Sequence, residues 1–233
     1  MQQLLTEILL NDDVVNSFYN NYNTNTKFRT WLTSILPEIE DCKKLKQDNP
    51  WHIYNCLDHI LHSVEAINKL STHLNDNARK ILAYTMFLHD VGKPACHIRR
   101  YSKLYKKEID SFFNHNKASV DVAKRVLPAW GFNNNEQQII QKLVFEHDVF
   151  MFITLEDDHN PYHHVLTYDY LNSLIKNLNQ THDGITMIKW LTLVGKADNL
   201  AQNPQLTGPS LLTIDKMQNM INSLENKLSG ENL

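Results

Sequence analysis

The chain has 233 residues, 42% of them hydrophobic, and a formal net charge of −3. This length allows one large domain or two small ones with a sizeable core, and the charge excludes an overall electrostatic footprint for nucleic acid. Three cysteines without a CxxC pair, and no signal-peptide pattern, predict reduced thiols and a cytoplasmic location. No apolar stretch approaches the roughly 20 residues that cross a membrane, so no membrane partner is expected.

Apolar residues recur at spacings of three and four, glycine is scarce, and strand-like alternation is rare. This pattern predicts an all-α fold, with prolines at or near the helix breaks. The expected helices cover residues 2–20, 26–36, 53–72, 76–90, 115–129, 135–150, 164–178, 184–202 and 213–228. The last helix has an apolar stripe that predicts either packing against the body or a partner-binding face. The stripe consists of Ile214, Met217, Ile221, Leu224 and Leu228.

The most informative stretch of the chain is His89-Asp90, which closes the apolar run 81–88 and precedes Val91-Gly92-Lys93-Pro94. An imidazole and a carboxylate at the end of a buried helix need a metal or a comparably strong partner. We expect Gly92 to allow a sharp turn. Lys93 then places a positive charge beside the same point, and a metal next to a lysine predicts a phosphate site.

Other polar side chains also map to apolar helix faces. His59, His115 and His147 could each be a hydrogen-bonded core histidine, and Asp198 could belong to an ion pair or a cap. Together with the His89-Asp90 pair they form a set of four imidazoles and two carboxylates on five helices. Such a set suits Mn, Fe, Co, Ni or Zn better than Ca, with Mg as a further candidate. It exceeds one four-coordinate ion and fits two metals bridged by a carboxylate. The candidate metal ligands are His59, His89, Asp90, His115, His147 and Asp198.

The order of His59, the pair His89-Asp90, and Asp198 resembles the HD superfamily of metal-dependent phosphohydrolases, which are all-α. A closer likeness is to the HD region of bacterial tRNA nucleotidyltransferases, the CCA-adding enzymes. The similar segments are Leu36-Pro37-Glu38, residues 47–54, Asp58-His59-Ile60-Leu61, residues 89–94, Phe113-Asn114-His115 and residues 196–202.

The resemblance implies a single HD-type helical bundle over residues 1–233. Its core would span about 36–203, with extra N-terminal helices in 1–35 and a C-terminal helix in 204–233. The chain has no Gly-Gly or Gly-Ser motif followed by paired aspartates, which the nucleotidyl-transfer head requires. It therefore resembles the HD part standing alone, and we do not expect it to add CCA.

The resemblance also implies roles for the ligands. His59, His89, Asp90 and Asp198 would hold one metal, and Asp90 would bridge to a second ion that His115 and His147 complete. Two positions depart from the family pattern. Asn114 stands where glycine is common, and Asp148 follows His147 where many members have a second histidine.

The implied activity is phosphate-ester hydrolysis by a water whose pKa one or two divalent metals lower to about 7. Asp90 and Lys93 are the expected catalytic residues. The segment 93–107 carries six lysines and arginines, two tyrosines and no acidic residue. This strip predicts either contact with a nucleotide or RNA end through Lys93, Arg99 and Arg100, or an exposed basic loop.

The expected substrates are therefore phosphomonoesters or phosphodiesters of nucleotides or RNA ends. One alternative is a catalytically idle, metal-containing domain that binds a nucleotide or tRNA as a sensor, but a pure binder would not need all six ligands. Another alternative is a hydrolase of a dinucleotide or an alarmone, for which the chain shows no specific motif.

Overall fold

The computed structural model describes residues 1–230 and confirms the all-α fold class. None of the helices in this part is both long and apolar enough to cross a membrane. The helices are α1 (Gln2–Leu9), α2 (Val14–Thr24), α3 (Thr26–Ile35), α4 (Glu38–Lys44), α5 (Cys56–Leu70), α6 (Asp76–Leu88), α7 (His115–Ala129), α8 (Asn134–Glu146), α9 (Tyr168–Leu178), α10 (Gly184–Leu200) and α11 (Gly208–Gly230). The short strands are β1 (Ile98–Ser102), β2 (Lys107–Ser111), β3 (Ile153–Thr154) and β4 (His164–Val165).

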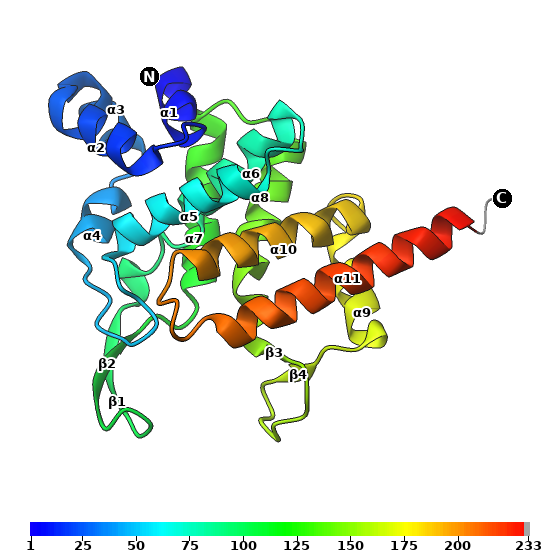
Figure 1. Cartoon of the computed structure of the whole chain (residues 1–233). Helices are drawn as coiled ribbons and strands as arrows, with labels where there is room; N and C mark the ends of the chain where they lie inside the picture. The colour runs from blue at the N-terminus through cyan, green and yellow to red at the C-terminus, as the bar shows by residue number, and fades with distance from the viewer. Residues whose placement is uncertain (231–233) are drawn as a thin grey trace.

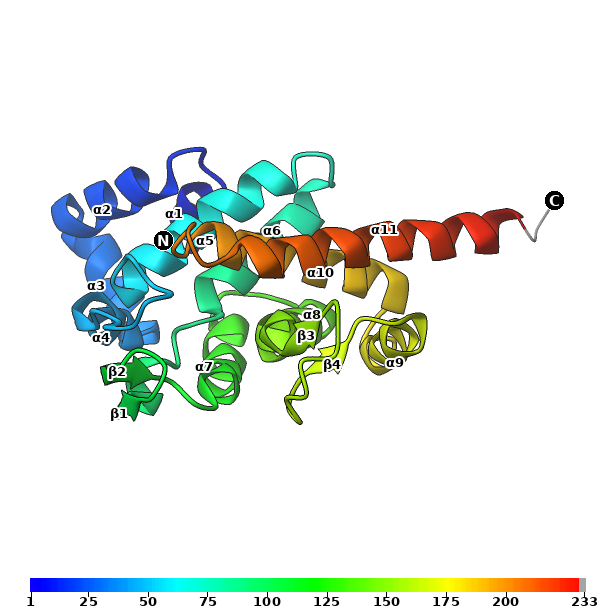
Figure 2. The same cartoon turned by 60° about the horizontal axis from the view of Figure 1, so that its bottom comes forward.

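The centre of the molecule is a group of mutually packed helices. Helix α5 packs against α6 and α10, and α8 packs against α6, α7 and α10. Helices α1–α3 lie at one end of this group and α9 at the other (Figure 1). Figure 2 shows that α11 lies along α10 and extends past it. On α11, Ile214, Met217 and Ile221 are buried and Leu224 is partly buried, which supports packing against the body; the side chain of Leu228 lies outside the described residues.

Two sequence features explain where α5 sits and begins. Its residues at helical spacing on one face, from Leu57 to Ile67, are fully buried against its neighbours. Asn55 caps the helix, because its side-chain oxygen accepts the backbone N–H of Asp58 at 2.9 Å. Asparagines cap α3, α6 and α8 in the same way. The cap at Asn55 fixes the first turn of α5, which carries His59.

The structure corrects several expected elements. The helix expected over 2–20 is two helices, because α1 ends at Leu9 and Asp13 caps α2 by accepting the N–H of Asn16. The short helix α4 was not predicted. The helix expected to reach residue 150 ends at Glu146 and continues as a 3₁₀ turn, η2 (His147–Phe152). The helices expected from 164 and 213 begin at Tyr168 and Gly208.

The basic segment after Lys93 is a β-hairpin rather than a loop. After a short 3₁₀ turn, η1 (Pro94–Cys96), strands β1 and β2 pair antiparallel with Arg99 opposite Asp110. Adjacent residues of a strand point to opposite faces, so Arg99 and Arg100 face in opposite directions. The hairpin projects from the body near α4 (Figure 1).

Candidate metal centre

Six polar side chains meet where five helices begin or end. His59 lies in the first turn of α5, and His115 begins α7. The pair His89-Asp90 follows α6 directly, and His147 follows α8. Asp198 lies in the last turn of α10. Each of the six residues is at most 9% exposed, so the structure brings all the predicted ligand candidates into one buried cluster.

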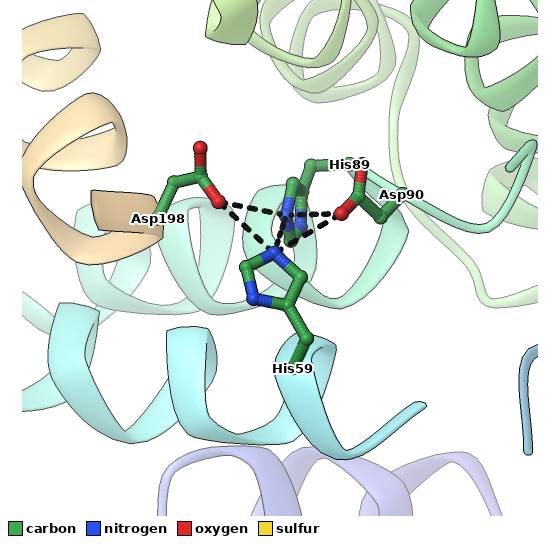
Figure 3. Close-up of side chains that lie close together, drawn as sticks. All are labelled: His59, His89, Asp90 and Asp198. Carbon is green, nitrogen blue, oxygen red and sulfur yellow. Dashed lines mark hydrogen bonds and ion pairs between the residues drawn. The ribbon is translucent and has the colours of Figure 1, made fainter. Parts of the chain in front are cut away.

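Four of them surround one point, and Figure 3 shows them converging. The Nε2 atom of His59 lies 3.2 Å from that of His89, 3.1 Å from Asp90 Oδ2 and 3.0 Å from Asp198 Oδ1. The Nε2 atom of His89 lies 3.2 Å from Asp90 Oδ2 and 3.6 Å from Asp198 Oδ1. Two atoms bound at about 2.1 Å to a common ion are about 3.0–3.4 Å apart at octahedral or tetrahedral angles. The four residues therefore fit a divalent transition-metal ion.

A second group uses the other oxygen of the same aspartate. Asp90 Oδ1 lies 3.1 Å from His115 Nε2 and 3.7 Å from His147 Nε2, and the two Nε2 atoms are 3.2 Å apart. The Asp90 carboxylate thus faces both groups, Oδ2 toward one and Oδ1 toward the other. These three residues could hold a further ion.

The backbone fixes the tautomer of all four imidazoles. Each Nδ1 lies within hydrogen-bond distance of a backbone carbonyl, which only accepts, so Nδ1 carries the proton and Nε2 keeps its lone pair in the neutral ring. Within each pair, two lone pairs then face each other at 3.2 Å, and only a cation between or beside them satisfies both. The Nδ1 contacts are His59 to Ala201 at 3.1 Å, His89 to Met86 at 2.6 Å, His115 to Phe112 at 2.8 Å and His147 to Val144 at 2.7 Å.

The charges of the cluster favour a cation. Burial alone would raise the pKa of Asp90, but the charges of His89 and Lys93 outweigh it and hold the pKa well below its usual range. Burial also disfavours ionised Asp198, yet hydrogen bonds from His59 and His89 keep its pKa low. In the metal-free protein, burial lowers the pKa of His59, while hydrogen bonds to Asp198 and Asp90 raise it to about 9. A proton then occupies the place where a metal ion fits.

Lys93 lies inside the centre rather than on a solvated loop. It is 5% exposed, and its Nζ lies 2.5 Å from Asp90 Oδ2, 3.0 Å from Gln47 Oε1 and 3.3 Å from His52 Nε2. The contacts with Gln47 and His52 are hydrogen bonds, and the contact with Asp90 is an ion pair. In this structure Lys93 orients and neutralises Asp90, and contact between Lys93 and a phosphate stays a prediction.

The chain turns over residues 89–93, as expected, and Gly92 is required there for its small size rather than for its backbone freedom. Its φ is not positive, contrary to the expected use of glycine's backbone freedom. A Cβ at Gly92 would lie 2.5 Å from the backbone nitrogen of Ser119 and 2.6 Å from the carbonyl oxygen of His115. The segment after Asp90 therefore packs directly on α7, which places His115 beside Asp90.

Asn114 has a left-handed backbone conformation. Its φ is 63°, in the left-handed region that glycine adopts freely and asparagine tolerates better than most other residues. The backbone makes this turn immediately before His115. Asparagine is therefore compatible with the backbone that this turn requires.

The two arginines of the strip have different surroundings. Arg99 forms ion pairs with Asp48 and Asp110, each at 3.0 Å. It lines a groove of about 830 Å³ that none of the six metal-ligand candidates lines. Arg100 donates to Ser111 Oγ at 2.6 Å and lies 5.2 Å from the ring centre of Phe113, which is 60% exposed. Phe113, over which Arg100 lies, is two residues before His115 in the chain.

The centre opens to solvent on one side. The side chains of Asp198 and His115 are each 11% exposed, and that of Asp148 is 19% exposed. Those of His59 and Asp90 are at most 1% exposed. The solvent-exposed side of the cluster is therefore the side of the α10 C-terminus and the α7 N-terminus.

Several residues around the centre were not predicted. Gln47 and His52 hold Lys93. The sequence gives no signal for Gln47, and His52 was expected to pack at the entry to its helix or to line the site. The buried thiols of Cys42 and Cys56 donate to the carbonyls of Val91 and Asp90 at 3.8 and 3.6 Å. Asp148 contacts both His115 and His147. Its signal was present, because His147-Asp148 repeats the His-Asp order of residues 89–90 at another helix end.

Comparison with known proteins gives no relative to transfer a function from. No protein-family profile matches the chain, and no curated protein is significantly similar to it in sequence. The assignment of ligands and of chemistry therefore rests on the geometry of the site itself. That geometry is a buried His/Asp cluster that could hold a metal ion.

Proposed function

We propose that this chain is a metal-dependent phosphohydrolase of the HD type, acting on phosphate esters of nucleotides or of RNA ends. One observation carries the proposal: two imidazole pairs direct their Nε2 lone pairs at each other on the two sides of one buried carboxylate, Asp90. A histidine that only packs in the core does not need its Nε2 lone pair directed at a second imidazole and a carboxylate. Metal ligands do converge in this way, with each Nδ1 held by a second group. The order of these residues along the chain agrees with the HD pattern.

The protein residues in this proposal hold and tune the site. His59, His89, Asp90 and Asp198 would bind the ion, which supplies Lewis acidity that lowers the pKa of a coordinated water and neutralises phosphoryl oxygens. The carbonyls that accept from Nδ1 fix the rings. Lys93 holds the Asp90 carboxylate and adds a positive charge on which an anionic substrate can draw.

The hairpin supports a nucleotide-like substrate. Arg100 over the exposed ring of Phe113 combines a cation and an aromatic face, which together suit a phosphate and a base. Further cations continue from Arg100 toward the hairpin tip, at Lys103 and Lys106, while Lys107 is paired with Asp48 at 3.5 Å. This arrangement favours an anionic ligand that is longer than a single phosphate.

The test is hydrolysis by the purified protein with Mn²⁺, Ni²⁺, Co²⁺ or Mg²⁺. The substrates are nucleoside monophosphates, 2′,3′-cyclic nucleotides, dinucleotides and short RNAs with a terminal phosphate. We expect metal-dependent turnover that Asp90→Asn and Asp198→Asn abolish and that Asp121→Asn, at an exposed position, leaves intact. Circular dichroism verifies that each variant is folded.

Two results would contradict the proposal. The first is turnover that persists in Asp90→Asn and Asp198→Asn at the wild-type rate. The second is no turnover with any metal or substrate. If the second result came with tight metal and nucleotide binding, the chain would be the catalytically idle binding domain instead.

A further inference from the structure

We propose that Asp148 is a ligand of a second divalent ion, so that Asp90 bridges two ions with matching ligand sets. This inference rests on the proposed metal centre and adds a residue to it. With Asp148 included, the second ion would be held by two imidazoles, one oxygen of Asp90 and a carboxylate of its own.

The position of Asp148 carries the inference. Its Oδ2 lies 3.2 Å from His115 Nε2, and its Oδ1 lies 3.3 Å from His147 Nε2. Asp198 contacts both rings of the other imidazole pair through a single oxygen, Oδ1, at 3.0 and 3.6 Å, whereas Asp148 directs a different oxygen at each ring. Asp148 therefore stands beside the close group of Asp90, His115 and His147, with its carboxylate spanning both Nε2 atoms.

The charges point the same way. A divalent ion held by His115 and His147 alone would be balanced only by a share of the Asp90 charge, part of which Lys93 already neutralises from the Oδ2 side. Among residues 1–230, no lysine or arginine forms an ion pair with Asp148. Its carboxylate is thus available to balance the second ion.

The chain holds Asp148 in place at the centre. His147 and Asp148 open the turn η2 directly after α8, and the tight turn presents two adjacent side chains to one point. Phe150 in the same turn packs onto Gly195 of α10, where a Cβ would lie 2.2 Å from the ring. This contact anchors η2 against the helix that carries Asp198, so the Asp148 carboxylate is set by core packing.

The two sets offer the same chemistry. Each has two imidazole nitrogens and two carboxylate oxygens, a mixture that suits Mn, Fe, Co, Ni or Zn and does not suit Ca. Both sites should therefore take the same ion. Asp148 and Asp198 lie on the solvent side of their sets, at 19% and 11% side-chain exposure, which leaves the buried face to the imidazoles and Asp90.

The test counts metal ions in protein that has been stripped of metal and dialysed against Mn²⁺. Metal per chain is measured by mass spectrometry, and electron paramagnetic resonance separates isolated Mn²⁺ from an exchange-coupled pair. We expect two ions per chain and a coupled spectrum in the wild type. In Asp148→Asn we expect one ion with an isolated-ion spectrum, and at least about tenfold weaker binding of the second ion.

Matched variants make the result specific. Asp148→Glu keeps a carboxylate and should retain the second ion, whereas Asp121→Asn should behave as wild type because Asp121 is exposed and paired with Lys124. Retention of one ion in Asp148→Asn shows that the variant is folded at the first set. Two tightly bound, coupled ions in Asp148→Asn, or a single ion in the wild type, would overturn the inference. No bound Mn²⁺ in the wild type would instead overturn the proposed metal centre.

Discussion

The backbone N–H of Gly92 donates a hydrogen bond to the hydroxyl of Ser119 at 2.9 Å, in a contact with no room for a side chain. This contact joins the segment after Asp90 to helix α7. Because His115 begins α7, the distance between the shared carboxylate and the second imidazole pair depends on it.

Gly92→Ala should therefore damage both stability and the second half of the centre. The added methyl group meets backbone atoms, which cannot rotate away, so we expect a loss of about 1–3 kcal/mol in the free energy of unfolding. Urea denaturation measures this loss, and Mn²⁺ stoichiometry should fall toward one ion. Gly208→Ala is the matched control, because a Cβ there has no neighbour within 4 Å. Equal stability of the two variants would refute this account of Gly92.

Lys93→Met should destabilise the metal-free protein strongly. The substitution leaves Asp90 buried and ionised without its ammonium partner at 2.5 Å, and breaking a buried ion pair costs about 3–5 kcal/mol. A bound metal ion supplies positive charge to the same carboxylate, so saturating Mn²⁺ should restore much of the loss.

Chemical denaturation of Lys93→Met, once with EDTA and once with Mn²⁺, measures the loss in the free energy of unfolding without and with the metal. Lys124→Met is the control, because Lys124 is exposed and its partner Asp121 is also exposed; its effect should stay within about 0.5 kcal/mol. A stability loss in Lys93→Met that Mn²⁺ does not change at all would contradict the role given to Lys93.

The metal-free protein should lose stability as the pH rises. The pKa values of His59 and His89 are about 9 in the folded state against an ordinary 6.5, so their protonation stabilises the fold fully below pH 6.5 and is lost as the pH rises through about 9. Asp90 and Asp198 have lowered pKa values and contribute above pH 3.8, so they do not offset this loss.

Melting curves between pH 6.5 and 9 test whether the stability of the metal-free protein falls as the pH rises. With EDTA the melting temperature should fall across this range, because the free energy of unfolding decreases by at least about 1 kcal/mol. With Mn²⁺ it should not fall, because the ion replaces the proton. A flat or rising curve with EDTA would mean that the imidazole pairs are not held by a proton in the metal-free protein.

Two neighbouring arginines should affect substrate binding differently. Arg100 lies over the exposed ring of Phe113, whereas Arg99 is paired with Asp48 and Asp110 on the other face of the hairpin. We expect Arg100→Ala to raise KM for a nucleotide or RNA-end substrate several-fold, with a reduced dependence of binding on salt. Arg99→Ala should leave KM close to the wild-type value. A larger rise in KM for Arg99→Ala than for Arg100→Ala would place the substrate on the Arg99 face of the hairpin.

Much of the helical fold could be predicted from apolar spacing and caps. The buried face of α5 and the helices near 26–35, 76–88 and 115–129 follow the expected pattern. The hairpin could not be predicted, because its tip lacks the Asn-Gly or Gly that usually marks such a turn. Lys106 adopts the positive φ, 52°, in place of a glycine. Nor did the break before Asp13, where polar residues cap a new helix without any proline or glycine.

The candidate ligands were predictable because each lies on an apolar face, where an unpaired polar group is costly. Their convergence was not derivable from spacing, since it depends on close helix contacts such as that of Gly195 with Phe150. The supports of Lys93 were also out of reach, because Gln47 and His52 belong to an irregular segment. Asp148 was treated as a departure from a pattern, although it repeats the His-Asp order.

The most direct measurement is anomalous diffraction from crystals of the protein soaked in Mn²⁺. We predict an anomalous peak about 2.0–2.2 Å from the Nε2 atoms of His59 and His89, and a second peak at the same range from those of His115 and His147. Asp90 should lie between the two peaks. The metal centre would be contradicted if, at saturating Mn²⁺, no anomalous peak lay beside either imidazole pair and each pair kept its 3.2 Å separation.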